Sequence, residues 1–212
     1  MDKPVIIFGA SGIGKAALEI FESNGIDVYG FLDKDETLHQ STIGEISVLG
    51  DPEDHGFLKL IGQKCEAFVA TDDNVLRKEQ VEHLNESRKV MPVNAVHQHA
   101  YISRTATIGH GNFINSGVHM GLDAHLGHHG IIHANAIIEQ DVSIGDFVQI
   151  GAGSIINQGV EIAESAFIGS GAVIVAGLKI GKNARIGAGS VVIRNVEEGE
   201  TVFGNPAQKI EK

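Results

Sequence analysis

Tryptophan is absent from this chain, and aromatic residues make up only 5 % of it. Stacked aliphatic side chains therefore have to supply most of the core. One cysteine excludes a disulfide framework and a zinc site of four cysteines. No apolar run reaches about 18 residues, which argues against a membrane-spanning helix. Proline is also scarce, with 4 residues against 27 glycines, so the glycines indicate turns within an ordered structure rather than disorder.

Positive charge is in short supply as well. The chain has 16 lysines and arginines against 27 acidic residues, for a net charge of −11, and its basic residues form no run. Nucleic acid and anionic membranes are therefore not expected as partners. The first residues, Met1 to Pro4, carry no signal-peptide pattern, and we expect a cytoplasmic protein.

An aliphatic residue stands at every sixth position from Ile102 to Val192 without a miss. Neither a helix, with period 3.6, nor an ordinary strand, with period 2, sustains such spacing. A short fixed period indicates a solenoid, whose units bury their apolar faces only by stacking on one another. We predict an all-β, left-handed parallel β-helix of hexapeptide repeats over residues 91–194, in which residues about 18 apart stack. Residues 195–212 are expected to cap it.

The N-terminal segment has a different pattern. The apolar run Val5–Phe8 enters a glycine-rich loop, Gly9–Lys15, which is followed by helical spacing and by a second apolar run, Val28–Leu32. This order predicts a Rossmann-like α/β domain over residues 1–90, with a parallel sheet. Backbone N–H groups at the start of a helix favour phosphate, and glycines let it approach. Asp33, directly after the second strand, is placed to bond a ribose or a base. The spacing alone leaves open a nucleotide site or simply a tight turn.

A second polar cluster follows the expected strand Ala67–Ala70. It comprises Thr71–Asn74 and, in the helical stretch behind them, Arg77. Ligands of doubly wound sheets bind at the carboxyl ends of the strands, which is where this cluster falls. A capped helix start explains Asp73 and Asn74 equally well.

Several stretches together resemble one protein family. They are Phe8–Gly12, Phe31–Asp33, Val48–Gly50, Asp73–Asn74 with Arg77, Ala136–Glu139, Ser143–Phe147 and Val202–Ala207. On them the chain resembles the two-domain hexapeptide-repeat sugar acyltransferases, of the UDP-amino-sugar N-acetyltransferase and sialic acid O-acetyltransferase type. The resemblance implies a homotrimer whose N-terminal domain holds a nucleotide-linked sugar. It also implies acetyl-CoA as co-substrate, bound between subunits of the β-helix, and no metal.

The resemblance also implies the contacts. Those to the sugar nucleotide are Gly9, Ser11, Gly12, Ile13, Asp33, Lys34, Asp73, Asn74 and Arg77. Those to CoA are Gln149, Gly151, Gln158, Gly169, Gly187 and Lys182. The three glycines stand 18 residues apart, in one column that a pantetheine arm could approach. Ordinary turn glycines and a solvated lysine are the alternative for this second set.

The chain departs from the family at the centre of the chemistry. Gln140 stands where the family has its catalytic histidine, Gln149 where it has a second histidine, and Gln158 where it has a glycine. Glutamine can hydrogen-bond but cannot accept a proton as a general base. We therefore expect His133 to be the base, because an imidazole ionises near neutral pH. Glu139 would orient the reacting groups, and Gln140 and Gln149 would steady the oxyanion.

Two alternatives remain at this stage. The glutamines allow a homologue that binds ligands in a trimer but does not catalyse. His110, His128 and Asp146 share one column, which would suit a metal in a carbonic-anhydrase-like trimer. Outward polar columns on β-helices also serve simply as solvent-facing ladders, and the two-domain layout argues against the metal enzyme.

Overall fold

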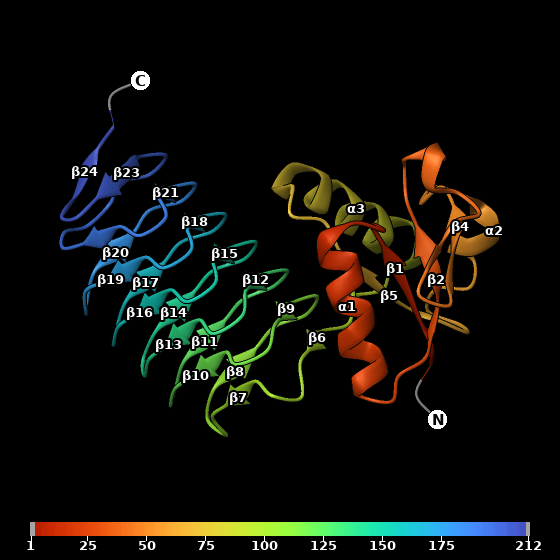
Figure 1. Cartoon of the computed structure of the whole chain (residues 1–212), viewed down its shortest axis with the longest axis horizontal. Coiled ribbons are helices and arrows are strands. Elements are labelled where there is room, and N and C mark those ends of the chain that lie inside the picture. The colour runs from red at the N-terminus through yellow and green to blue at the C-terminus, as the bar shows by residue number, and fades with distance from the viewer. Residues whose placement is uncertain (1–2, 211–212) are drawn as a thin grey trace. The chain divides into compact units, whose positions relative to one another are not determined.

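The computed structural model describes residues 3–210, so positions 1–2 of the expected first domain and 211–212 of the expected cap lie outside the described residues. The chain divides between Gln98 and His99 into two compact units, whereas the expected boundary followed residue 90 (Figure 1). We call residues 3–98 the α/β unit and residues 99–210 the β-helix unit. Among the described helices, none has the length and apolar character needed to cross a membrane.

The α/β unit is built on a mostly parallel sheet with the strand order β3-β4-β2-β1-β5. β1 lies between β2 and β5 and is parallel to both, and only β3 runs antiparallel to its neighbour. All four residues of β1 are buried because helices and neighbouring strands surround it. The strands of this sheet are β1 (Val5–Phe8), β2 (Val28–Leu32), β3 (Thr42–Ile43), β4 (Ile46–Gly50) and β5 (Glu66–Val69), and β6 (Ala95–Val96) lies outside it.

Three α-helices and one short 3-10 helix connect these strands. They are α1 (Gly12–Ser23), η1 (Glu36–Leu38), α2 (His55–Leu58) and α3 (Asn74–Arg88). α1 ends at Asn24 and Gly25, where Gly25 adopts the left-handed conformation that commonly stops a helix. Phe21 of α1 meets Phe68 of β5 edge to face, with 5.7 Å between ring centroids. The strand–loop–helix–strand order predicted for the start of the chain is confirmed.

The β-helix unit consists of two-residue strands that form three parallel sheets, visible as stacked coils in Figure 1. One sheet runs β7-β10-β13-β16-β19-β22, the second β8-β11-β14-β17-β20, and the third includes β9-β12-β15-β18-β21. Met120 pairs with Ile138 and Ile138 with Ile156, which is the 18-residue stacking expected of a left-handed parallel β-helix. The strands are β7 (Tyr101–Ile102), β8 (Thr107–Ile108), β9 (Phe113–Ile114), β10 (His119–Met120), β11 (His125–Leu126), β12 (Ile131–Ile132), β13 (Ile137–Ile138), β14 (Ser143–Ile144), β15 (Gln149–Ile150), β16 (Ile155–Ile156), β17 (Glu161–Ile162), β18 (Phe167–Ile168), β19 (Val173–Ile174), β20 (Lys179–Ile180), β21 (Arg185–Ile186) and β22 (Val191–Val192).

The periodic aliphatic residues form the core of this unit. From Ile114 to Val192 each is at most 2 % exposed, and burying such a side chain contributes roughly 1.5–3 kcal/mol. Ile102 and Ile108 are half-buried because β7 and β8 lie at the ends of their sheets. The core is therefore a single aliphatic column enclosed by the three sheets.

The coils turn at corners that share one backbone conformation. The third residue after each inward aliphatic from Ile108 to Ile186 has a positive φ, and glycine, asparagine or aspartate occupies most of these positions because they tolerate it best. His129, Phe147 and Ser165 are the exceptions, with φ between 57° and 61°. Glycine directly after the inward residue, as at Gly151 or Gly169, has a different reason: a Cβ there would meet the backbone of the next coil.

A β-hairpin closes the C-terminal end of the β-helix. β23 (Thr201–Gly204) adds to β21 in parallel, and β24 (Ala207–Lys209) pairs antiparallel with β23. The antiparallel partner ends the stacking of the coils, since no further parallel strand follows within the described residues.

Candidate active site

The glycine-rich loop of the α/β unit follows β1 and leads directly into α1. Gly9 has a φ of 111°, and a Cβ on it would lie 2.6 Å from the carbonyl oxygen of Ala70. Gly14 is packed equally closely, because a Cβ on it would meet the Gly9 carbonyl oxygen. Only glycine fits at either position, so these two residues bring the loop, the end of β5 and α1 together.

Asp33 ties the end of β2 to this loop. One carboxylate oxygen accepts a hydrogen bond from Ala10 N at 2.7 Å, and the other accepts from Asp35 N at 2.9 Å. A hydrogen bond from Thr37 lowers the pKa of the neighbouring Asp35 carboxyl below its ordinary value. These contacts hold the carboxylates at the carboxyl edge of the sheet, where a ligand of such a fold is expected.

A cavity of about 220 Å³ opens at this edge. Four of the residues predicted to contact the sugar nucleotide line it: Gly9, Ser11, Asp33 and Lys34. Thr71 belongs to the polar cluster that the sequence places at this edge, whereas sequence reasoning missed the others, namely Asp35, Leu38, Ala70, Leu76 and Gln80. The sequence did contain a pattern that could have predicted Leu76 and Gln80. These two residues are four apart in the helix that follows Asp73, so they lie on the same helix face.

The remaining predicted sugar contacts are not among the residues that line this cavity. Gly12 begins α1, and Ile13 points into the core with 8 % of its surface exposed. Asp73 caps α3 by accepting hydrogen bonds from Val75 N at 2.8 Å and Leu76 N at 3.1 Å. The capping explanation for this residue therefore holds, and a contact with ligand stays a prediction.

Arg77 is almost fully buried beneath the same edge, with 1 % of its surface exposed. Its guanidinium donates to the Thr71 carbonyl oxygen at 2.7 Å and to the side chain of Asn74. Burial lowers the pKa of Arg77 to about 10, partly opposed by the nearby carboxylates of Asp72 and Asp73. Arg77 and Asn74 thus fix the loop between β5 and α3, which carries Thr71 into the cavity wall.

In the β-helix unit, the corner after β13 gathers three polar residues around Gln140. Glu139 Oε2 accepts a hydrogen bond from Gln158 N at 3.0 Å, and Gln158 Nε2 donates to Asp141 Oδ2 at 3.2 Å. Gln158 lies one coil further along and therefore bridges the carboxylates on both sides of Gln140. Glu139 is half-buried, whereas Gln140 and Gln158 are exposed. This corner brings together Glu139, Gln140 and Gln158 as expected, and adds Asp141, which sequence reasoning missed although it follows Gln140 directly.

His133 lies on a different corner of the same coil. It follows β12, is half-buried, and meets the ring of Phe113 edge-on with 6.2 Å between centroids. Gln149 belongs to β15, in the same sheet as β12, and is 7 % exposed. Within one chain, His133 and Gln149 therefore belong to one sheet, and Glu139 follows a strand of another.

The glycine column predicted to meet CoA is packed against the chain itself. A Cβ on Gly151 would lie 2.4 Å from Ser170 N, and one on Gly169 2.5 Å from Ala188 N. At Gly187 the ring of Phe203 occupies this space. Lys182 pairs with Glu164 at 2.8 Å, and this hydrogen bond raises the pKa of Lys182 above its ordinary value. Coil-to-coil contact explains the glycines, and their contact with CoA stays a prediction.

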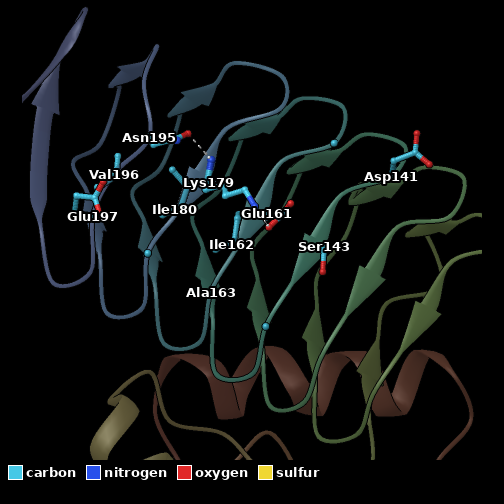
Figure 2. Close-up of a pocket in the computed structure, with 13 residues that line it drawn as sticks. Asp141, Ser143, Glu161, Ile162, Ala163, Lys179, Ile180, Asn195, Val196 and Glu197 are labelled. Atoms are coloured by element: carbon cyan, nitrogen blue, oxygen red, sulfur yellow. Dashed lines mark hydrogen bonds and ion pairs between the residues drawn. The ribbon is translucent and has the colours of Figure 1, made fainter.

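A shallow groove of about 680 Å³ runs along the sheet that contains β14, β17 and β20. Figure 2 shows Asp141 at one end of it and Glu197 at the other, with Glu161 and Lys179 between them. Lys179 pairs with Glu161 at 3.0 Å, and its backbone N–H donates to Asn195 Oδ1 at 2.9 Å. The groove begins beside Gln140 and was not predicted, because its walls come from successive coils.

The histidine column forms a ladder of hydrogen bonds from backbone N–H groups to side chains of the next coil. His128 Nδ1 accepts from His110 N at 3.0 Å, Asp146 Oδ1 accepts from His128 N at 2.7 Å, and the two imidazoles stack with centroids 5.7 Å apart. Between residues 3 and 210, no three or more His, Cys, Asp or Glu side chains are grouped so that they could hold a metal ion.

The two units together define a hexapeptide-repeat transferase with an N-terminal α/β unit. The PglD N-terminal domain family matches residues 4–84, and the bacterial transferase hexapeptide family matches residues 141–176 and 159–194. Comparison with curated proteins gives no match.

Solved structures extend this match to both units. A histidine-to-alanine variant of GDP-perosamine N-acetyl transferase from Caulobacter crescentus, in complex with CoA and GDP-perosamine, is 30 % identical, with a TM-score of 0.91 over 99 % of this chain and 97 % of that one. WeeI from Acinetobacter baumannii is 27 % identical, with a TM-score of 0.86 over 98 % and 99 % of the two chains. The acetyltransferase domain of PglB from Neisseria gonorrhoeae, in complex with acetyl coenzyme A, shares the fold at 24 % identity, with a TM-score of 0.89 over 99 % and 100 %. The chain belongs to the two-domain hexapeptide-repeat family of sugar acetyltransferases.

Proposed function

We propose that this protein transfers an acyl group, with acetyl as the expected group, from CoA to an amine or hydroxyl of a nucleotide-linked amino sugar or related sugar. The observation that carries the proposal is the match to the Caulobacter crescentus enzyme, whose structure contains both CoA and GDP-perosamine and aligns with both units of this chain. Each unit also offers a feature that suits its part of the reaction.

The α/β unit suits the nucleotide. The side chain of Ser11, the N-cap of α1, makes no capping hydrogen bond, and the first turn contains no acidic residue. The N–H groups at this helix start are therefore left for an anion, and Lys34 also lines the cavity beside Ser11. A diphosphate at this place would meet both kinds of positive charge.

The corner of Glu139, Gln140 and Gln158 suits the acyl group. In a direct transfer, the acceptor nitrogen or oxygen forms a bond to the thioester carbon, the carbon–sulfur bond breaks, and CoA leaves as a thiolate that takes up a proton. The acceptor loses a proton to a base, for which we propose His133. Glu139 orients these groups, and the amides of Gln140 and Gln149 with backbone N–H groups steady the oxyanion.

A homotrimer brings these groups together, since His133 and Glu139 lie on different corners of a single chain. Exposed apolar side chains lie in or just after strands of the sheet that contains β13, the strand before Glu139: Leu122, Ile137, Val175 and Ile193. The outward residues of the β8-β11-β14-β17-β20 sheet, in contrast, are all polar. Exposed apolar residues along the sheet that leads to Glu139 favour burial of this side against a second copy, so that the acyl site is formed between subunits.

Release of free CoA measures this reaction directly. We expect acetyl-CoA consumption that depends on an amino sugar linked to GDP or UDP and that exceeds the rate without the sugar. Absence of turnover with both sugar classes, together with no calorimetric binding of CoA, would contradict the proposal. The same assay tests the non-catalytic alternative that Gln140 suggests: if Gln140→His is active and the wild type is silent, the natural protein is a binding homologue.

A further inference from the structure

The guanidinium of Arg185 carries an uncompensated positive charge on the last coils of the β-helix unit. Arg185 belongs to β21 and is exposed, and its Cζ atom lies 4.6 Å from the centre of the half-buried Phe167 ring. No carboxylate within the described residues pairs with this guanidinium. A ring contact engages the flat face of a guanidinium, so the N–H donors at its edge stay available.

The two lysines of the same coil differ from Arg185. Lys179 pairs with Glu161 at 3.0 Å, and Lys182 pairs with Glu164 at 2.8 Å. Their charges are therefore balanced within the chain. Because the chain as a whole carries a net charge of −11, a cation without an acidic partner is a local exception, and it favours an anionic ligand at this place.

An exposed aromatic ring lies on the neighbouring strand. β23 pairs in parallel with β21, with Thr201 opposite Arg185, so that Phe203 comes next to Gly187. The ring of Phe203 occupies the space that a Cβ on Gly187 would need, and 55 % of Phe203 is exposed. The missing side chain of Gly187 thus seats this ring, whose exposed surface can stack on a flat apolar group.

We propose that this side of the last coils binds the nucleotide end of CoA, with Arg185 on a phosphate and Phe203 on the adenine. CoA ends in 3′-phosphoadenosine diphosphate, which combines several phosphate oxygens with one flat base. A planar guanidinium donates to phosphate oxygens in pairs, and bases stack on aromatic side chains. The inference rests on the proposed function, which supplies CoA, and adds the residues that distinguish CoA from an acyl carrier without a nucleotide.

The position of Arg185 suits a ligand whose other end reaches the acyl site. Gln149 pairs with Phe167, and Phe167 pairs with Arg185, so Arg185 lies two strands beyond Gln149 in one sheet, at a distance of about 10 Å. Gly151 and Gly169 follow the first two of these strands and carry no side chain that would block the path between them. An arm that starts beside Gln149 can therefore deliver its phosphates to Arg185.

Calorimetric titration of the full-length protein with CoA tests the proposal without requiring turnover. Arg185→Leu should weaken CoA binding about 10- to 100-fold, because the variant loses charge-assisted hydrogen bonds to phosphate. Arg185→Lys keeps the charge without the planar fork and should lie between the two. Phe203→Ala should weaken CoA binding about 10-fold through the lost stacking. Arg104→Leu removes the same charge from another exposed position of the β-helix unit and should bind CoA like the wild type.

A second ligand separates a direct contact from a change of structure. 3′-Phosphoadenosine 5′-diphosphate, the nucleotide end of CoA without its arm, should compete with CoA for the wild type. It should compete at least about 10-fold less well for Arg185→Leu.

Four outcomes overturn the inference. Unchanged CoA binding in a folded Arg185→Leu protein, or in Arg185→Gln if the leucine variant does not fold, would remove the role of Arg185. An equal loss in Arg104→Leu would reduce the effect to net charge. A loss of GDP or UDP binding with CoA binding intact would assign Arg185 to the sugar nucleotide. A wild type that binds no CoA would remove the acyl donor of the proposed function, and this inference with it.

Discussion

The carboxylate of Glu139 accepts a hydrogen bond from the backbone N–H of Gln158, 3.0 Å away on the next coil. This contact fixes the side chain of Glu139. The side-chain amide of Gln158 donates a hydrogen bond to Asp141, the residue that follows Gln140. A residue that cannot titrate thus lies between two anchored carboxylates. Any negative charge at this corner therefore comes from the carboxylates of Glu139 and Asp141 and not from Gln140.

Replacing Glu139 by glutamine tests the charge with little change in shape. The amide oxygen of Glu139→Gln can still accept from Gln158 N, so the free energy of unfolding should change by less than about 1 kcal/mol. If the carboxylate orients the reacting groups, kcat should fall by about 10- to 100-fold. Steady-state CoA release measures the effect, and Glu86→Gln on the surface of α3 is the control. A fully active variant would remove Glu139 from the site.

The assignment of the base to His133 predicts a larger loss. His133→Ala should lower kcat by about 10²- to 10⁴-fold, the range that general-base catalysis contributes. His125→Ala, on the exposed face of β11, should retain wild-type activity. If the two variants lose activity equally, or neither does, another group takes the proton.

Gly169 and Gly171 should respond differently to alanine. At Gly169 a Cβ would lie 2.5 Å from Ala188 N, so the coils must move apart, at a cost of about 1–3 kcal/mol. At Gly171 the Cβ meets nothing within 4 Å, and its φ of 68° alone should cost about 1–2 kcal/mol. Gly171→Asn, which tolerates this φ, should recover much of the loss, whereas Gly169→Asn should not. Urea denaturation measures the free energy of unfolding of each variant. A Gly169→Asn protein that is clearly more stable than Gly169→Ala would contradict this account.

Arg77 should resist its conservative replacement. Arg77→Lys cannot reach both the Thr71 carbonyl and the Asn74 side chain, because an ammonium group lacks the planar fork of a guanidinium. We expect a loss of about 1–3 kcal/mol in the free energy of unfolding. Arg104→Lys, at an exposed site of the β-helix unit, should leave stability unchanged. A loss confined to nucleotide binding would instead give Arg77 a direct contact with ligand.

The proposed trimer predicts that a charged substitution on its subunit contact lowers the mass of the assembly in solution. Val175 is 42 % exposed and follows β19, in the same sheet as β13, and a carboxylate there would be buried against a second copy. Val175→Glu should therefore reduce the mass in sedimentation from three chains to one and abolish acetyl transfer. Lys209→Glu, on the terminal hairpin, should do neither. A wild type that sediments as a monomer and still turns over would contradict an active site between subunits.

The repeat could be read from the sequence because each period-six aliphatic is set by local geometry. Pairs such as Met120 and Ile138 follow from the 18-residue coil alone. The corner conformation follows less directly, since Phe147 adopts a positive φ that its side chain disfavours. There the stacking of the coils overrides local preference.

The site was harder to predict because its parts come from distant segments. The stacking placed Gln158 over Gln140, but not the hydrogen bonds from Gln158 to Glu139 and Asp141, which depend on side-chain directions. A cavity of about 200 Å³ in the α/β unit combines Pro52 from one loop with Gln80 and His83 from α3. No spacing in the sequence joins them until the sheet sets these segments side by side.

Acetyl transfer by the unmodified protein is the most direct test of the central claim. Purified wild type, acetyl-CoA and a GDP-linked amino sugar should yield one free thiol of CoA for each sugar molecule that gains an acetyl group. Thiol titration measures the free CoA, and mass spectrometry measures the acetylated sugar. Thiol release without an acetylated sugar, or no release at all while CoA and nucleotide both bind, would contradict an acyltransferase that works despite Gln140.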